Sequence, residues 1–278
     1  MHLGVVMLGV GAQAGACIGV LEALSARGIE PFAVCGLGTA AWPAALHCAG
    51  MDAAAMMRAL GAAAHMGRRL LDSHASARRM LRGKGNSLLE GRRIDALLCA
   101  QAGEKPMALC ARQGVFLCRS ARSGRRMIFT TQAYAQDSGA LMSMQAPLCY
   151  AARASMAMPP YLPPVSWMGC TLLPEGDAGF ACRQLLAMGA QRVLVVNPRP
   201  SSAQMDALDL TGLQMQRLDE LPPASAVLRV QMPKGSLSLD ALPICARAGH
   251  EAADSELDGI FARMGMAQGR VLPFRVLR

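Results

Sequence analysis

The chain has 278 residues, of which 53% are hydrophobic and only 4% aromatic, and its formal net charge is +9. This length can bury a substantial core, and the predominance of Ala, Leu, Val and Met favours helices packed on a sheet over an all-β sandwich. Ten cysteines and five histidines are scattered singly, without a Cys-x-x-Cys pair or a metal-ligand spacing. We therefore expect an α/β protein with no metal, no cofactor and reduced thiols.

The first stretch, residues 3–21, is apolar and uncharged, so a signal peptide or a membrane span has to be considered. No Lys or Arg precedes it, and five glycines and Gln13 interrupt it. Such interruptions are typical of a buried strand, a glycine loop and a helix in succession. We expect a soluble, cytoplasmic protein that can attach peripherally to a membrane.

Short apolar runs bounded by turn residues predict strands, and helical periodicity fills most of the space between them. The predicted strands are residues 3–8, 31–35, 107–110, 115–118, 127–131, 192–196 and 226–230. The predicted helices are residues 17–25, 44–48, 52–64 and 180–188, with a late helix through 257–264. The alternation of strand and helix predicts a mostly parallel central sheet with helices on both faces, in a single domain that covers residues 1–278.

A glycine loop joins the first predicted strand to the first helix, with the sequence Gly9-Val10-Gly11-Ala12-Gln13-Ala14-Gly15. Amides at such a helix entry can bind an anion, which is either the pyrophosphate of a dinucleotide or the oxyanion of an acyl hydrolase. The spacing differs from the dinucleotide fingerprint, and no acidic residue ends the second predicted strand, which counts against a nucleotide. A third interpretation is that small residues only allow the helix to pack closely on the sheet.

A sharp turn follows the second predicted strand, with the sequence Gly36-Leu37-Gly38-Thr39-Ala40. Small residues surround it, and Pro43 lies in the first turn of the next helix, where its missing amide costs nothing. This is the layout of a nucleophile elbow, Gly-x-Ser-x-Gly, in which the central hydroxyl is lifted out of the sheet. Here the central residue is Gly38, so the elbow carries no obvious nucleophile.

Three further stretches match one known family in the same order along the chain. They are the helix Gly19-Val20-Leu21-Glu22-Ala23-Leu24, the Pro-rich segment at residues 153–165 that begins Arg153-Ala154-Ser155, and the helix end and strand at residues 188–196. Together with the glycine loop and the elbow, they make the chain similar to the patatin-like phospholipases along nearly its whole length. The resemblance implies a patatin-like three-layer fold.

Members of that family hydrolyse acyl esters of lipids with a Ser-Asp dyad, and the resemblance assigns these positions to Gly38 and Pro174. Neighbouring Glu175 or Asp177 would substitute for the acid if the loop shifts. The motif Asp177-Ala178-Gly179 imitates the family's Asp-Gly-Gly, but it needs a deletion of about four residues, against about one for Pro174. The oxyanion-hole backbone would be Gly9, Val10, Gly11 and Ala12, with Gln13 where a basic residue is usual.

These departures support a pseudoenzyme that keeps the fold and a lipid- or acyl-binding or regulatory role, with no catalytic residue intact. The alternative is an active lipid acyl hydrolase with relocated groups, Thr39 as nucleophile and Asp177 as its partner. A nucleotide-binding α/β protein that uses the glycine loop as a phosphate cradle is the third class.

Basic residues gather between residues 67 and 126, where 14 Lys or Arg stand against 4 Asp or Glu. The local balance of +10 accounts for the whole excess of charge, and part of this segment is expected to be a mobile insertion. An anionic membrane surface would be bound through Arg68, Arg69, Arg78, Arg79, Arg82, Arg92 and Arg93. The alternative is a solvated Arg-rich face without a partner. Nucleic acid is not expected, because Phe116 is the only aromatic residue here.

Overall fold

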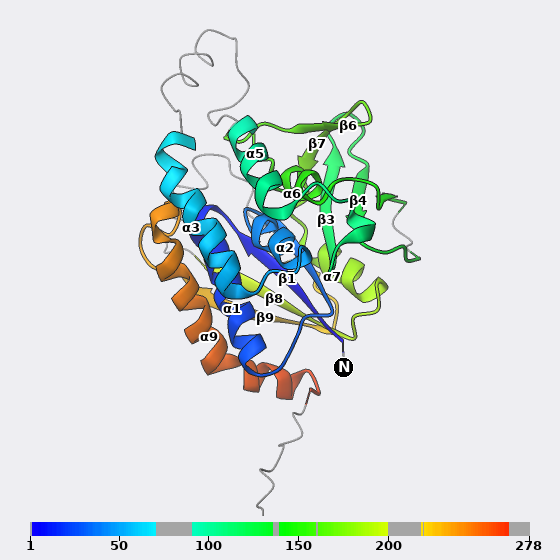
Figure 1. Cartoon of the computed structure of the whole chain (residues 1–278). Coiled ribbons are helices and arrows are strands. Elements are labelled where there is room, and N and C mark those ends of the chain that lie inside the picture. The colour runs from blue at the N-terminus through cyan, green and yellow to red at the C-terminus, as the bar shows by residue number, and fades with distance from the viewer. Residues whose placement is uncertain are drawn as a thin grey trace, which may run out of the picture.

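One mixed β-sheet organises the part of the chain that the computed structural model describes, residues 2–70, 91–135, 139–159, 161–199, 218 and 220–266 (Figure 1). Its strands are β1 (Leu3–Gly9), β2 (Ala33–Gly38), β3 (Gln113–Ser120), β4 (Arg126–Thr130), β5 (Leu141–Ser143), β6 (Val165–Trp167), β7 (Cys170–Pro174), β8 (Arg192–Arg199) and β9 (Ser225–Gln231). The order is β5-β4-β3-β2-β1-β8-β9, and the β6–β7 hairpin joins β3. Strands β3, β2, β1, β8 and β9 run parallel, while β4 and β7 are antiparallel to β3.

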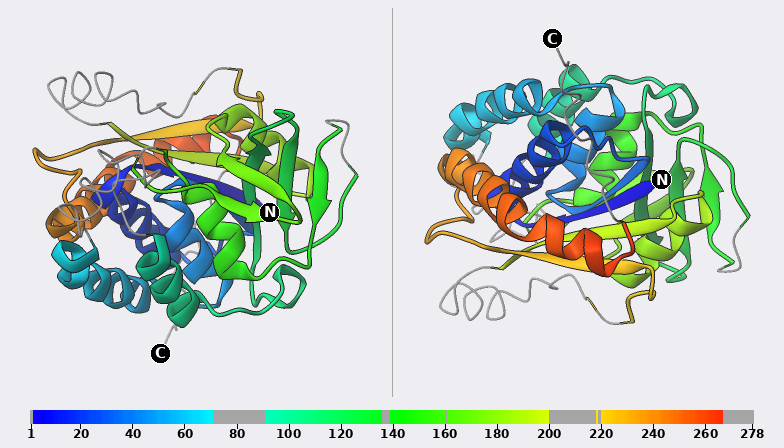
Figure 2. Two further views of the ribbon diagram at one scale, coloured as in Figure 1. Left: turned by 90° about the horizontal axis from the view of Figure 1, so that it is seen from above. Right: turned by 90° about the horizontal axis from the view of Figure 1, so that it is seen from below.

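Helices cover both faces of this sheet (Figure 2). They are α1 (Ala14–Ala26), α2 (Ala41–Cys48), α3 (Ala53–Leu70), α5 (Gly91–Ala102), α6 (Leu148–Met156), α7 (Ala178–Ala187) and α9 (Leu242–Arg263), with the short 3-10 helices η1 (Gly11–Gln13), η2 (Met107–Leu109) and η3 (Leu239–Ala241). Among the described helices, α7 packs on one face, and the side chains of α1, α2, α3, α5, α6 and α9 share the core on the other. The fold class predicted from the sequence is confirmed.

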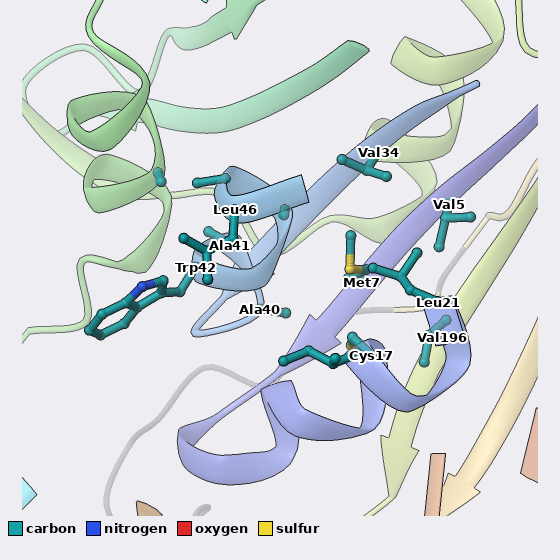
Figure 3. Close-up of a cluster of buried hydrophobic side chains, with 14 of the residues drawn as sticks. Val5, Met7, Cys17, Leu21, Val34, Ala40, Ala41, Trp42, Leu46 and Val196 are labelled. Carbon is teal, nitrogen blue, oxygen red and sulfur yellow. The ribbon is translucent and has the colours of Figure 1, made fainter. Parts of the chain in front are cut away.

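The central strands are apolar on both faces, which is what a parallel sheet between two helical layers requires. In β1, Val5 and Met7 belong to the core under α1 and α2, whereas Val6 and Leu8 belong to the core under α7. Figure 3 draws Met7 with neighbouring strand residues among the side chains of α1 and α2. The alternation continues through β2, β3 and β8, so the period-2 pattern is hidden in near-continuous apolar runs.

Helices α1 and α9 pack at very close range because glycines line their contact. A Cβ on Gly19 would collide with the carbonyl oxygen of Ala246 and would lie 2.8 Å from the amide nitrogen of His250. A Cβ on Gly249 would in turn collide with the backbone of Ala16. Helix α9 thereby holds α1, the helix that begins at the glycine loop, in a fixed position against the sheet.

One segment that was predicted to be a strand is not a strand in the structure, and several observed helices and strands were not predicted. Residues 107–110 were expected to form a strand but form η2, because the amide of Leu109 bonds the carbonyl of Pro106 in a tight turn. Helices α5 and α6 and strands β5, β6 and β7 were not predicted. Of the basic segment, residues 71–90 lie outside the described part of the chain, while residues 113–120 form β3 inside the sheet.

No helix in the described ranges is long and apolar enough to cross a membrane.

Candidate functional site

The elbow after β2 is a sharp turn whose apex has no side chain. Gly38 ends β2 with a φ of +65°, in the left-handed region that glycine adopts without strain. A Cβ on Gly36 would lie 2.5 Å from the carbonyl oxygen of Ala40 and 2.7 Å from the amide nitrogen of Ala41, so only glycine allows α2 to start this close to the strand. The chain therefore forms the sharp strand-to-helix turn that is typical of a nucleophile elbow, with glycine at the central position.

Thr39, the residue after the apex, ties the elbow to the glycine loop. Its amide donates to the carbonyl of Gly9 at 3.0 Å. Its hydroxyl lies 3.1 Å from the same carbonyl oxygen and 3.0 Å from that of Gly11, so the proton of the hydroxyl is directed at the backbone. In this arrangement the hydroxyl bonds to backbone carbonyls, whereas a nucleophile would have to donate this proton to a base.

The glycine loop lies beside the elbow, because β1 and β2 are paired up to Gly9 and Gly38. Its amides are partly used within the loop itself. The amide of Val10 donates to Oε1 of Gln13 at 3.2 Å, and the amide of Gln13 returns a bond to the carbonyl of Val10. The Gln13 side chain is almost completely buried, and its Nε2 has no hydrogen-bond partner among the described residues. The Gln13 side chain is therefore the hydrogen-bond partner of the Val10 amide in this loop.

A segment far away in the sequence covers this loop. Gly11 has a φ of +59°, and a Cβ there would collide with the carbonyl oxygen of Leu237 and lie 3.0 Å from its carbonyl carbon. The neighbouring Ser236 is completely buried, and its hydroxyl has no partner among the described residues. No pattern in the sequence indicates this contact, because residues 235–238 are separated from the loop by more than 200 positions.

The pairing of β3 brings the end of β7 to the end of β2. Cys118 pairs with β4 on one edge and with Pro174 on the other, so β7 occupies the same edge of β3 that β2 uses. Cys35 of β2 pairs with Val115 of β3. Gly38 lies three residues after Cys35, and Cys118 lies three residues after Val115. Strands β2 and β7 run in opposite directions along this edge of β3, where β2 pairs as far as Val115 and β7 ends opposite Cys118.

The two acidic residues after Pro174 are held by an arginine of β4 and by backbone amides. Arg126 pairs with Glu175 and with Asp177, each at 3.0 Å, and its guanidinium carbon lies 4.1 Å from the ring centroid of Phe180. Asp177 is the N-cap of α7 and accepts the amide of Phe180 at 2.8 Å. Glu175 accepts the amides of the two residues that follow it. Neither carboxylate is hydrogen-bonded to Thr39, although all three residues are described.

Other titratable groups near the elbow are buried without a catalytic arrangement. Cys35 lies inside the sheet, and burial raises the pKa of its thiol. His47 lies in α2, where burial and then the nearby guanidinium of Arg112 lower its pKa to about 4. Across the described residues, no three His, Cys, Asp or Glu side chains are grouped to hold a metal ion.

The arginines that the sequence suggested for a membrane surface are only partly placed by the structure. Arg92 and Arg93 are exposed in the first turn of α5. Arg68 and Arg69 lie at the end of α3, where the structure describes the backbone but not the side chains. The remaining three, Arg78, Arg79 and Arg82, lie outside the described residues.

Comparison with known proteins identifies the class to which this fold and elbow belong. The sequence model of the patatin-like phospholipases matches residues 5–182, and the chain therefore belongs to that family. The resemblance inferred from the motifs is confirmed, and membership implies lipid substrates or ligands. A search of curated proteins found no match to the sequence.

Solved structures are similar to this chain at low sequence identity, and the similarity to VipD shows the fold. VipD from Legionella pneumophila is 12% identical with a TM-score of 0.52, and the alignment covers 93% of this chain and 67% of VipD. Human GIVD cytosolic phospholipase A2, solved with methyl gamma-linolenyl fluorophosphonate and terbium chloride, is 12% identical with a TM-score of 0.48, over 95% of this chain and 59% of that one. A complex of ExoU and SpcU from Pseudomonas aeruginosa gives 15% identity and a TM-score of 0.41, over 95% and 52% of the chains. The present chain thus spans between half and two thirds of these proteins.

Proposed function

We propose that this chain is a patatin-fold pseudoenzyme, which binds a lipid or an acyl chain, or regulates a partner, without hydrolysing an ester. The observation that carries the proposal is the glycine at the apex of the elbow, where Gly38 has a left-handed backbone and no hydroxyl. Pro174, which has no carboxylate, ends β7 on the same edge of β3. Both positions of the family dyad are therefore assigned to residues that cannot transfer a proton.

The surroundings of the elbow support the same conclusion. The Thr39 hydroxyl is directed at two carbonyl oxygens, and Asp177 caps α7 and pairs with Arg126. The Val10 amide is bonded to Gln13, so it is not available to an oxyanion in this arrangement. An active hydrolase with Thr39 as nucleophile and Asp177 as base would have to break several of these contacts.

The test exposes the purified chain to a fluorophosphonate probe and to a short-chain nitrophenyl ester. We expect no labelling above a heat-denatured control and an ester turnover that is equal in the wild type, Thr39→Ala and Asp177→Asn. Asparagine still caps a helix, so the Asp177→Asn chain should remain folded. Turnover that either substitution abolishes would overturn the proposal and support an active hydrolase with relocated groups.

A lipid-binding role has its own measurement, titration of the chain with a fluorescent long-chain fatty acid and with phosphatidylcholine vesicles. Saturable binding of either probe is expected from a patatin fold that has kept its ligand site. If neither probe binds, the lipid-binding part of the proposal is wrong. Titration with NAD and ATP under the same conditions should give no heat, and heat would instead favour the nucleotide interpretation of the glycine loop.

Attachment to an anionic membrane is the second part of the proposal and depends on exposed arginines. Arg92 and Arg93 begin α5, which Figure 1 places at the same end of the molecule as the β6–β7 hairpin, and Met168 at the tip of that hairpin is 87% exposed. Cationic side chains at the same end of the molecule as an exposed apolar residue suit a negatively charged lipid surface, on which each basic residue contributes about 1 kcal/mol.

Sedimentation with vesicles tests this attachment. Binding to phosphatidylserine vesicles should exceed binding to neutral ones, fall with added salt, and weaken in the double variant Arg92→Ala with Arg93→Ala. The matched control removes two other exposed arginines, Arg58 of α3 and Arg247 of α9. Equal partition to neutral and anionic vesicles, or equal weakening in both double variants, would contradict an arginine surface at the start of α5.

A further inference from the structure

Two of the ten cysteines, distant in the sequence, meet between two helices. Cys99 of α5 and Cys149 of α6 bring their sulfur atoms to 2.6 Å, although 50 residues separate them in the chain. Cys149 is 3% exposed and Cys99 is half-buried. The cysteines are scattered singly in the sequence, so their spacing does not predict this pair. The two sulfur atoms meet only because α5 packs against α6.

The other cysteines whose contacts are known have a different environment. The thiols of Cys17 and Cys118 point at backbone carbonyls, of Leu8 and Met127 respectively, as isolated buried thiols do. Among the described residues, Cys99 and Cys149 are the only two cysteines whose thiols are hydrogen-bonded to each other. A covalent S–S bond is about 2.05 Å long, so bond formation requires the sulfurs to approach by about 0.6 Å.

The two helices are already fixed relative to each other, which keeps the sulfurs together. Arg153 of α6 pairs with Asp95 of α5 at 2.6 Å, four residues before Cys99. The amide of Cys149 itself donates to the carbonyl of Gly103, just after the end of α5. A thiol pair held at this distance has a high effective concentration, because closure needs almost no further ordering of the chain.

We propose that Cys99 and Cys149 form a redox-active thiol pair that closes into a disulfide between α5 and α6 when the protein meets a peroxide. The half-buried Cys99 attacks hydrogen peroxide first: its sulfur forms a bond to one oxygen, the O–O bond breaks, and the other oxygen takes up the thiol proton of Cys99 and leaves as water. The thiol of Cys149 then attacks the resulting sulfenic acid, its proton leaves with the hydroxyl as a second water, and the S–S bond forms. Two thiols are oxidised and one peroxide is reduced to two waters.

The order of the two steps follows from the environment of each sulfur. Burial, and next the hydrogen bond with Cys99, raise the pKa of Cys149 to about 12, so Cys149 stays a thiol at neutral pH. The thiolate is the nucleophile in peroxide chemistry, and Cys99 is the more exposed partner. Cys149 is therefore the second cysteine of the reaction, which resolves the sulfenic acid.

The disulfide would connect helices that pack against the elbow. Helix α5 contacts α2 through Gln101, whose Oε1 accepts the indole N–H of Trp42 at 2.9 Å, and α3 through a bond from Gln101 to the carbonyl of Ala59. Helix α6 belongs to the same buried core as α2. Oxidation would thus join α5 and α6 covalently, and both of these helices pack against α2, the helix that begins at the elbow.

The experiment compares the full chain after treatment with dithiothreitol and after treatment with hydrogen peroxide. Free thiols are counted with a maleimide in denaturant, and a digest without reductant is analysed by mass spectrometry. We expect peroxide to remove two of the ten thiols and to produce one cross-linked peptide pair containing Cys99 and Cys149, which dithiothreitol reverses. The oxidised chain should also melt at a higher temperature than the reduced one.

The variants separate this pair from the other cysteines. Cys99→Ser and Cys149→Ser should each lose the cross-link and the peroxide-induced rise in Tm. Cys110→Ser is the matched control, because Cys110 is also half-buried and lies on the same tryptic peptide as Cys99, yet its thiol faces the carbonyl of Pro106. The proposal is overturned if wild-type chain exposed to peroxide carries sulfinic acid at Cys99 without a cross-link, or if Cys110 forms the disulfide instead. The wild-type digest decides this even where a variant fails to fold.

Discussion

Replacement of Thr39 by Val is the most direct perturbation of the elbow, because it keeps the branched shape and removes only the hydroxyl. The carbonyl of Gly9 keeps one donor, the amide of residue 39 at 3.0 Å, while the carbonyl of Gly11 loses the Thr39 hydroxyl at 3.0 Å. One net hydrogen bond in a partly buried turn is worth about 1 kcal/mol, and up to about 2 kcal/mol where the carbonyl stays unsatisfied. The expected change in Tm is a fall of about 2 to 8 °C for a chain of this size.

Guanidinium chloride unfolding and thermal melting measure this loss, and Thr39→Ser is the control. Serine keeps the hydroxyl, so Thr39→Ser should retain most of the stability that Thr39→Val loses. If Thr39→Val is as stable as the wild type, the hydroxyl does not tie the elbow to the glycine loop. A stable Thr39→Val chain that had lost a measurable esterase rate, with Thr39→Ser still active, would assign Thr39 to chemistry.

Four further substitutions test packing, backbone strain and protonation. Gly19→Ala should destabilise by about 1 to 3 kcal/mol, because its Cβ meets the backbone of α9, whereas Gly61→Ala on α3, with open space around its Cβ, should stabilise by up to about 1 kcal/mol. Equal denaturation midpoints would contradict this. Gly38→Ala should cost about 1 to 2 kcal/mol at its left-handed φ, and an unchanged midpoint would mean that the turn relaxes. For His47, whose pKa is lowered to about 4, the unfolded chain takes up the proton first as pH falls below 6.5, so stability is complete above that pH and falls by about 3 kcal/mol towards pH 4. Denaturant titrations at several pH values should show that the free energy of unfolding of His47→Gln does not have this fall between pH 6.5 and pH 4. If His47→Gln has the same pH profile as the wild type, His47 is not the source of the fall.

The fold could be predicted largely from local patterns, and several of the missed elements are too short or too highly charged for their pattern to stand out. Strands β1, β2 and β8 are apolar runs between turn residues, and such runs can be recognised in the sequence because both faces of the sheet are buried there. Strand β9 instead alternates buried Leu228 and Val230 with exposed Arg229 and Gln231, a pattern that is also typical of a strand. Strands β5 and β6 have three residues each, too few to show a period of two. Helix α5 has buried apolar residues at helical spacing, Ile94, Leu98 and Ala102, but they lie in a segment rich in charged residues.

The candidate site could be predicted only where its residues are close in the sequence. The elbow and the glycine loop are each continuous, so Gly38 and Gly11 could be named without a structure. The covering contact from Leu237 and the thiol pair at Cys99 depend on tertiary packing across long separations, for which spacing gives no signal. Arg126, which pairs with Glu175 and Asp177, was visible only as one charge in a basic segment.

The absence of a hydroxyl at the elbow has a physical consequence for the rest of the site. A serine at the apex would hold a non-glycine residue in the left-handed region, at a cost of about 1 to 2 kcal/mol that active enzymes offset elsewhere. With Gly38 that strain is absent, and the groups around it are satisfied by the protein itself: Gln13 accepts the loop amide, and Thr39 donates to the loop carbonyls. A site for acyl transfer needs amides and a base left available to substrate. The internal bonding of this elbow is what the proposed binding or regulatory role predicts, because it leaves few of these groups available to a substrate.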